Sequence, residues 1–250
     1  MTKQEILAKV DHTLLKADAG WEDIRRICDE ALENSTASIC INPCWVERAV
    51  EYLGGRVPVC TVIGFPLGAT TTAAKVAEAK QALAEGCEEF DMVINIGRLK
   101  MGDTDYVRDE IRALKQAVGN KVLKVIIETC LLTDAEKETM CGVVCEAGAD
   151  FIKTSTGFST GGATFDDIAL FARCVKGRCR IKAAGGIRSV ADMERFIALG
   201  ADRLGTSSAI KIFNNEASGQ ECVMPPSRSR IFAAPGRFLS GYFLPRVTDC

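Results

Sequence analysis

Four ionisable residues interrupt short apolar runs of the kind that form buried strands. Asp91 lies within FDMVI, Lys124 within VLKVII, Lys153 within DFIK and Lys182 within RIKA. The three lysines follow one another at intervals of 29 residues, so they take the same position in three successive strand–helix units. We therefore expect neighbouring strands to direct several lysines into one interior.

Ammonium groups buried together repel one another and lose hydration, which costs free energy. A lysine avoids this cost by losing its proton, because a low dielectric and a nearby ammonium both lower the pKa of an amine. The free amine can attack a carbonyl carbon and form a Schiff base, while a carboxylate such as Asp91 keeps a second lysine charged and relays protons. The ordinary alternative is a snorkelling or ion-paired strand lysine, but three at one position of the repeat favour Schiff-base chemistry.

Two glycine-containing loops predict a phosphate site. Gly185 and Gly186 directly follow the run that contains Lys182, and residues 205–208 (GTSS) follow the last apolar run and precede a predicted helix. Glycine lets the backbone approach a ligand closely, and a serine at a helix start leaves N–H groups pointing outward for an anion. Tight turns and helix caps would explain either loop alone. The loops after strands seven and eight are, however, a recurrent phosphate site in α/β barrels.

The elements that must position these residues alternate regularly along the chain. Eight apolar runs are separated by segments with helical periodicity, such as the alanine-rich residues 70–85, which indicates parallel βαβ units covered on both faces. Eight units in about 215 residues predict an α/β protein, a single (β/α)8 TIM barrel over residues 1–220 that includes a short N-terminal helix. An open doubly wound sheet is the alternative, but its glycine-rich first βα turn is missing here.

The last thirty residues depart from this pattern. Residues 221–250 contain four of the seven prolines and four arginines but no lysine, and they have no period of 3.6 or 2. This composition predicts an irregular or disordered tail rather than a ninth unit. The abrupt change near Glu221 also raises the hypothesis of an altered reading frame.

Composition excludes several classes of function. The 31 basic and 33 acidic residues give no basic excess for nucleic-acid binding, and no apolar stretch is long enough to suggest a membrane span. Without a secretory signal, we expect a cytoplasmic protein whose twelve cysteines, none in a C-x-x-C pair, are reduced and mostly buried. The single histidine, His12, excludes multi-histidine metal sites, so in an enzyme without a cofactor the acid–base chemistry should come from Lys, Asp, Glu, Cys or Tyr.

The sequence resembles the deoxyribose-phosphate aldolase family of class I aldolases over roughly residues 3–212. The matching stretches are DHTLLK (11–16), SICINP (38–43), TVIGFPLG (61–68), DMVINIG (91–97), LKVIIET (123–129), GADFIKTSTGFSTGGAT (148–164), IKAAGGIR (181–188) and RLGTSSAI (203–210).

This resemblance implies reversible cleavage of 2-deoxy-D-ribose 5-phosphate to acetaldehyde and D-glyceraldehyde 3-phosphate, without a cofactor. It implies that Lys153 is the Schiff-base nucleophile, that Lys182 is the neighbouring cation, and that Lys182 shares proton transfer with Asp91. The partners implied are therefore a phosphorylated sugar and an aldehyde, with a homodimer as the family expectation and no nucleic acid or membrane.

The resemblance also assigns supporting residues. The phosphate-binding residues that it implies, largely through backbone N–H groups, are Gly157, Gly185, Gly186, Gly205, Ser207 and Ser208. Lys124 and Thr154 are expected to support the site. Cys40 is expected near the pocket, as a thiol reactive toward aldehydes or as a packed one, and His12 is expected to be structural. The family's terminal tyrosine, which can reach the active site, has its nearest counterpart in Tyr242, but here eight further residues follow it.

Two alternatives remain open at this point. One keeps the Schiff base but acts on another phosphorylated sugar, as transaldolase-like barrels do. The other is a catalytically silent phosphosugar-binding barrel, which would require loss of Lys153, Lys182 or Asp91, and all three are present.

Overall fold

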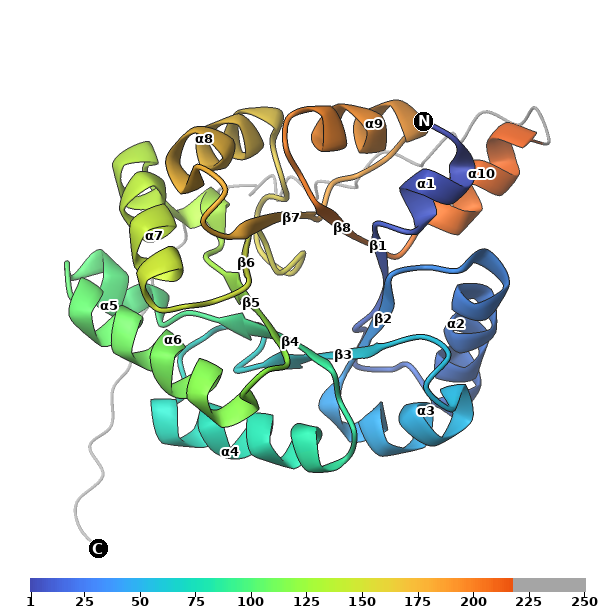
Figure 1. The fold of residues 1–250 in the computed structure, drawn as a ribbon, viewed down its shortest axis with the longest axis horizontal. Coiled ribbons are helices and arrows are strands. Elements are labelled where there is room, and N and C mark those ends of the chain that lie inside the picture. Colours follow the sequence, from blue (N-terminus) through green and yellow to red (C-terminus); the bar gives the residue numbers. More distant parts are fainter. Residues whose placement is uncertain (218–250) are drawn as a thin grey trace, which may run out of the picture.

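In the computed structural model, which describes residues 1–217, eight parallel strands close into a barrel in chain order (Figure 1). The strands are β1 (Val10–Leu14), β2 (Ser38–Ile41), β3 (Val59–Ile63), β4 (Glu89–Val93), β5 (Val122–Ile126), β6 (Phe151–Lys153), β7 (Arg180–Ala184) and β8 (Arg203–Thr206). Because β1 pairs with β8, the sheet has no open edge. The predicted TIM barrel is confirmed. The predicted tail, residues 221–250 with Tyr242, lies outside the described residues.

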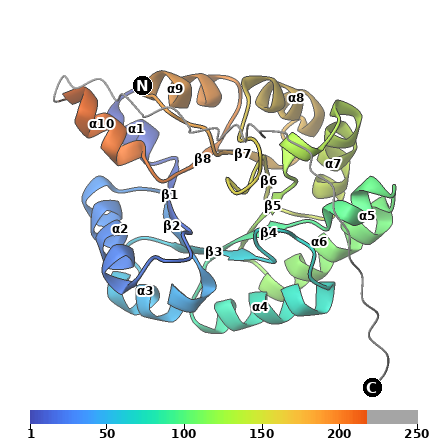
Figure 2. The same cartoon turned by 180° about the vertical axis from the view of Figure 1, so that it is seen from behind.

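Helices surround the barrel in both views (Figures 1 and 2). They are α1 (Lys3–Leu7), α2 (Trp21–Asn34), α3 (Val46–Leu53), α4 (Thr72–Ala84), α5 (Ile96–Lys100), α6 (Thr104–Val118), α7 (Asp134–Glu146), α8 (Phe165–Val175), α9 (Val190–Ala198) and α10 (Ala209–Ala217), with the 3-10 turns η1 (Pro43–Trp45) and η2 (Thr129–Leu131). The predicted short N-terminal helix is α1, which lies beside α10. Among the described helices, none is long and apolar enough to cross a membrane.

Polar caps fix where several of these helices begin. The side-chain oxygens of Thr71, Thr133, Thr164 and Ser189 each accept a backbone N–H from the first turn of α4, α7, α8 and α9. Each such cap stabilises a helix by about 1 kcal/mol. These caps therefore define where the loops before these four helices end.

The core has two unequal parts. A large apolar cluster fills the space between the strands and the helices, whereas a small one inside the barrel consists of Leu15, Cys40, Cys60 and Val62 with Phe65 packed against it. Much of the remaining barrel interior is ionic, because Asp11, Glu89, Asp91, Lys124 and Lys182 are all buried.

The strand register corrects one expectation about the lysines. Lys153 and Lys182 are direct partners across β6 and β7, but Lys124 pairs with Phe151, two residues before Lys153. Strands in a closed barrel are staggered, so equal spacing in sequence does not give equal depth. Lys124 therefore lies one layer deeper than the other two lysines.

Candidate active site

One carboxylate gathers the three lysines inside the barrel. The Nζ atoms of Lys153 and Lys182 lie 2.7 Å and 2.6 Å from the same oxygen, Asp91 Oδ2. Lys124 Nζ lies 2.9 Å from the other oxygen, Oδ1. The structure thus brings together the residues that the sequence singled out for chemistry, and it places their nitrogens in one compartment.

Three further charged residues complete the cluster, and sequence reasoning missed all of them. Asp11 Oδ2 lies 2.5 Å from Lys182 Nζ, and Glu89 Oε2 lies 2.6 Å from Lys124 Nζ. Arg203 Nη1 contacts both acids, at 2.5 Å from Asp11 and 3.2 Å from Glu89. Glu89 stands two residues before Asp91 and therefore on the same strand face, a signal that could have identified it.

The network fixes the charge states of its buried members. Burial alone would lower the pKa of Lys182, but the carboxylates of Asp11 and Asp91 outweigh it and raise that pKa. Burial would raise the pKa of Asp91, but the ammonium groups of Lys124, Lys153 and Lys182 hold it well below its usual value. At neutral pH, Lys182 is therefore a fixed cation and Asp91 a fixed anion.

Lys153 differs from the other two lysines in what it faces. It lines a cavity of about 520 Å³ at the C-terminal ends of the strands, whereas Lys124 and Lys182 do not. Within the network its ion pair is with Asp91, and its side chain keeps a small exposed fraction of 4% where theirs is 0%. An aldehyde in this cavity would thus meet the Lys153 amine.

The predicted phosphate-binding residues line the same cavity. They come from the loops after β6 and β7 and from β8 with its following loop, and they are Gly157, Gly185, Gly186, Gly205, Ser207 and Ser208. The cavity also includes Thr206 of the predicted GTSS segment, and Lys16, Thr156 and Arg188, which had not been assigned. Lys16 and Arg188 lie in the stretches DHTLLK and IKAAGGIR, and their positive charge was the available signal. Together they make this end of the cavity cationic.

The loops after β6, β7 and β8 form the rim of the cavity. Glycine is needed at and beside this rim for different structural reasons. Gly157, Gly185 and Gly186 have φ values of +84°, +79° and +76°, which favour glycine. Gly162, another residue that sequence reasoning missed, packs so closely on the next loop that an added Cβ would lie 2.5 Å from the Gly185 carbonyl carbon. Gly205 instead makes room for Lys182, because a Cβ there would lie 2.9 Å from the Lys182 Cε.

The end of β8 differs from the expectation in two details. Gly205 and Thr206 belong to the strand itself rather than to the loop after it. The backbone N–H of Ser208 donates to Thr206 Oγ1 at 3.1 Å, so this N–H is engaged within the turn. Helix α10 begins directly afterwards, at Ala209, and its N-terminus still favours a negative charge in this part of the cavity.

A buried glutamate positions the loop after β6. Glu128, at φ +55°, accepts the backbone N–H of Thr156 at 3.3 Å and also its hydroxyl. Thr156 Oγ1 in turn accepts the N–H of Phe158 at 3.0 Å. Left-handed backbone is uncommon for a residue with a side chain. We therefore read Glu128 as a positioning residue, which its place in LKVIIET could have indicated.

Thr154 and His12 have structural contacts rather than places in the cavity. Thr154 Oγ1 accepts the N–H of Ala184 at 3.1 Å and donates to its carbonyl at 3.2 Å, which joins β6 to β7. His12 Nε2 lies 2.6 Å from Glu30 Oε2 on α2, and burial lowers the pKa of its ring. These contacts agree with the supporting role expected for Thr154 and the structural one expected for His12.

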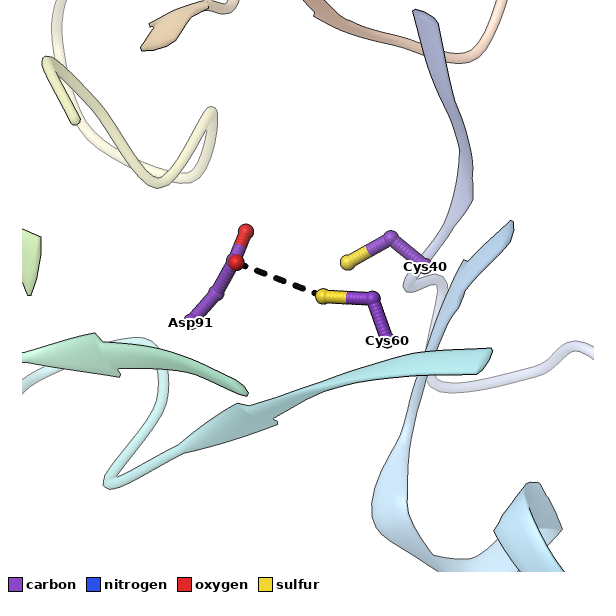
Figure 3. A group of neighbouring side chains, drawn as sticks. All are labelled: Cys40, Cys60 and Asp91. Atoms are coloured by element: carbon purple, nitrogen blue, oxygen red, sulfur yellow. Dashed lines mark hydrogen bonds between the residues drawn. The ribbon is translucent and has the colours of Figure 1, made fainter. Parts of the chain in front are cut away.

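Cys40 is fully buried and faces the ionic cluster without lining the cavity. Figure 3 shows it pointing toward Cys60 and Asp91, and one ligand atom from each of the three lies within 4.8 Å of the others. Thiolates and a carboxylate could hold a soft metal ion, but Lys124 Nζ already lies 3.3 Å from Cys60 Sγ and 2.9 Å from Asp91 Oδ1. This ammonium supplies the positive charge that a metal would bring, so the residues fit a metal poorly.

Comparisons with known proteins agree with this geometry. A family model described as DeoC/LacD family aldolase matches residues 6–215. A deoxyribose-phosphate aldolase of Clostridium botulinum (strain Alaska E43 / Type E3) is 57% identical over 216 residues, which is 86% of this chain and 98% of that protein. A second, from Clostridioides difficile (strain 630), is 56% identical over 213 residues, covering 85% and 97% of the two chains.

Solved structures are similar over the same region. An aldolase named QR15 superposes with a TM-score of 0.82 at 37% identity, covering 86% of this chain and 96% of its own. A deoxyribose phosphate aldolase from Aeropyrum pernix, described as tetrameric, has a TM-score of 0.78 at 33% identity and covers 87% and 93% of the two chains.

Proposed function

The chain belongs to the DeoC/LacD family of aldolases, and from this premise we propose that Lys153 is the Schiff-base lysine of its reaction. The protein is a carbon–carbon lyase, a deoxyribose-phosphate aldolase. It reversibly cleaves 2-deoxy-D-ribose 5-phosphate to acetaldehyde and D-glyceraldehyde 3-phosphate. The observation that supports Lys153 most strongly is that, of the three clustered lysines, it is the one that lines the cavity.

Formation of the Schiff base requires Lys153 to release a proton. The Lys182 ammonium contacts the same Asp91 oxygen and disfavours a second positive charge at that point. Asp91 can accept the proton from Lys153 but holds it only briefly, because its own pKa is well below the usual value. Asp91 therefore passes the proton on to water and does not retain it. The free amine of Lys153 then attacks C1 of the open-chain sugar.

Cleavage then follows from the charge of the imine. Loss of water from the first adduct gives a protonated imine at C1, which draws electrons from the C2–C3 bond as the C3 hydroxyl loses its proton. Glyceraldehyde 3-phosphate leaves, and an enamine remains on Lys153. A proton delivered to the enamine carbon regenerates the imine, and hydrolysis releases acetaldehyde. We assign both proton transfers to water bound near Asp91 and Lys182, an acid–base role worth about 10²–10⁴-fold in rate.

The substrate's phosphate belongs at the opposite side of the cavity. Gly157, Gly185, Gly186, Gly205, Ser207 and Ser208 are proposed to surround it, helped by the positive end of α10. The N–H groups of Gly185 and Ser208 are engaged within the protein, so the other members are proposed to supply the backbone donors. The side chains of Lys16 and Arg188 line the same cavity and add charge. Fixing the phosphate holds C1 of the sugar near Lys153, so part of the binding free energy serves to orient the substrate for attack.

Borohydride trapping tests the assignment of Lys153. The enzyme is incubated with acetaldehyde, reduced, and mapped by peptide mass spectrometry. We expect one N-ethyl lysine, at Lys153, and a matching loss of activity. The variant Lys153→Arg is the control, because it keeps the positive charge but cannot form the imine, and it should stay unlabelled. An N-ethyl group at Lys182 or Lys124 in the native protein would reject the assignment.

Assembly and location complete the proposal. We propose a homodimer, which light scattering on the purified protein would test, since a tetramer would give twice the expected mass. We also propose a cytoplasmic location. The ten cysteines within the described residues all carry free thiols, which agrees with a reducing compartment.

A further inference from the structure

Two cysteines form a buried pair inside the barrel, beside the residues proposed for catalysis. Cys40 on β2 and Cys60 on β3 are direct partners in the strand register, and both are fully buried. Figure 3 shows their side chains converging on Asp91 from two neighbouring strands, and a hydrogen bond of 3.3 Å runs from Cys60 Sγ to Asp91 Oδ1. The mechanism described above uses neither thiol.

The backbone places the two sulfurs where a disulfide could form. Neighbouring strands lie about 4.8 Å apart, and the Cα atoms of disulfide-linked cysteines are usually 4.4–6.8 Å apart. Both side chains point to the same face, and their Sγ atoms already lie within 4.8 Å of one another. Rotation of the two side chains can therefore close the bond without a large movement of the strands.

The two thiols differ in acidity. The neighbouring Cys60 thiol and the ammonium groups of Lys182 and Lys153 lower the pKa of Cys40, against the opposing effects of burial and of the Asp91 carboxylate. Burial raises the pKa of Cys60 well above the usual value. The pair thus combines a thiol that ionises more readily than usual with one that ionises less readily, as reactive dithiols do.

A second close pair of cysteines lacks this arrangement and provides a control. Cys145 on α7 and Cys179, directly before β7, have their Sγ atoms 3.1 Å apart. Burial raises the pKa of Cys179, and this pair lies against the large apolar cluster outside the barrel. The two sulfurs are therefore close together in the Cys145–Cys179 pair, but only in the pair inside the barrel do neighbouring ammonium groups lower the pKa of a thiol.

A reagent that enters the substrate cavity must pass Leu15 to reach Cys40. Leu15 lines that cavity and also packs in the small apolar cluster with Cys40 and Cys60. It therefore separates the thiols from the space that acetaldehyde must enter to reach Lys153. A hydroperoxide as small as hydrogen peroxide needs no more room than acetaldehyde does.

We propose that Cys40 and Cys60 are a peroxide-modified pair whose oxidation to a disulfide reversibly inactivates the aldolase. The Cys40 thiolate attacks one peroxide oxygen and displaces hydroxide, which takes up a proton and leaves as water, so that Cys40 becomes a sulfenic acid. The Cys60 thiol then attacks this sulfur, forms the S–S bond and releases a second water. Two thiols are oxidised, and one hydrogen peroxide is reduced to two waters.

The disulfide disturbs the site through Asp91. Oxidation removes the S–H that donates to Asp91 Oδ1 and moves Cys60 Sγ, which accepts a hydrogen bond from Lys124. Because small displacements at a reacting centre are costly, we expect the rate to fall on the order of 10- to 100-fold. The loss of activity rests on the proposed role of Asp91, whereas formation of the disulfide does not.

The test exposes the native enzyme to hydrogen peroxide, removes the excess with catalase, and measures activity before and after dithiothreitol. We expect inactivation that dithiothreitol reverses. In parallel, tryptic peptides 27–48 and 57–75 should become linked in proportion to the activity lost. Peptide 27–48 also carries Cys28 and Cys44, so fragment ions must assign the bond to Cys40. If the peptides become linked and activity does not fall, the disulfide forms but does not inactivate the enzyme through Asp91, and the proposed inactivation is rejected.

Variants separate the steps, each compared with its own untreated activity. Cys40→Ala should resist peroxide, whereas Cys60→Ala should lose activity in a way that dithiothreitol does not restore, because an unresolved sulfenic acid oxidises further. The double variant Cys145→Ala/Cys179→Ala should behave as the native enzyme does. Thermal unfolding checks that each variant folds, and the native peptide map remains decisive if one does not.

Several outcomes would overturn the proposal. Equal sensitivity of Cys40→Ala would exclude this thiol as the target, and a Cys145–Cys179 linkage that tracks the activity loss would move the switch to the other pair. Recovery with a chelator but not with dithiothreitol would indicate metal binding at Cys40, Cys60 and Asp91. Native peptides that stay unlinked while activity falls would exclude the disulfide altogether.

Discussion

The ionic cluster inside the barrel is built from side chains, whereas the glycine-rich rim of the cavity is built from backbone. In the cluster, the side chains of Lys153, Lys182 and Asp91 meet because the strand register aligns them. On the rim, glycines such as Gly185 and Gly186 contribute backbone in conformations that other residues rarely adopt. Under the proposed assignments, the chemistry depends on a few charged side chains, whereas phosphate binding is spread over several backbone segments.

This difference predicts unequal sensitivity to mutation. Removing one side chain from the cluster removes a reacting group or leaves a buried charge without its partner. Removing one side chain from the rim leaves most N–H donors in place. The following changes test that contrast, from the largest expected effect to the smallest.

Lys153→Ala should abolish turnover, with a loss of at least about four orders of magnitude in kcat, because neither of the other two clustered lysines lines the cavity. The fold should persist, since Asp91 keeps its contacts with Lys124 and Lys182. Steady-state cleavage of deoxyribose 5-phosphate measures the loss, and circular dichroism checks the fold. Residual activity above about a tenth of native, well beyond what other groups could supply, would remove Lys153 as the nucleophile.

Lys182→Leu should lower kcat by about 10²–10³-fold, because it removes the cation that contacts the same Asp91 oxygen as Lys153 and is proposed to take part in proton transfer. Steady-state cleavage of deoxyribose 5-phosphate measures the loss. Lys124→Met is the matched control, since Lys124 contacts the other oxygen of Asp91 from one layer deeper. An equal loss of kcat in both variants would indicate a general electrostatic effect instead of a specific partnership.

The sequence predicted the cluster in part, and the missing part has a physical cause. Lys153, Lys182 and Asp91 were visible because charged residues interrupt apolar runs at regular spacing. Asp11 and Arg203 were not recognised, because they meet only where β1 pairs with β8 and closes the barrel. Contacts of such long range leave no trace in local periodicity.

The rim shows a different limit. Gly185 and Gly186 were predicted from their place after an apolar run, but Gly162 was missed because its reason is close packing against the neighbouring loop. Likewise, the N–H of Ser208 was expected to point outward, whereas Thr206 accepts it. Sequence spacing predicts where a loop occurs, but which N–H groups remain free depends on side-chain contacts within the folded turn.

Asp11→Asn should lower stability in a pH-dependent way. Burial would raise the pKa of Asp11, but Lys124, Lys182 and Arg203 outweigh it and lower that pKa. A lowered pKa means that Asp11 adds stability above its unfolded pKa of about 3.9 and loses it as the pH falls toward the folded pKa. At pH 7 the variant should be less stable by about 3 kcal/mol. Urea unfolding should show this deficit shrinking in acid, and a deficit independent of pH would contradict the charge assignment.

Ser208→Asp should have the smallest effect and should be selective for phosphate. Ser208 lines the cavity directly before α10, and aspartate is as good as serine at a helix start, so the fold should be preserved. Its charge should repel the phosphate and lower kcat/KM for deoxyribose 5-phosphate by about tenfold.

The same change should hardly alter cleavage of free deoxyribose, which has no phosphate to repel. Ser208→Ala is the matched control, because it removes the hydroxyl without adding charge, and both substrates should then change little. If Ser208→Asp slowed free deoxyribose as much as the phosphorylated sugar, the carboxylate would be acting on the fold or on Lys153. The phosphate would then have to bind elsewhere in the cavity, and the separation between a chemical interior and a binding rim would fail at this residue.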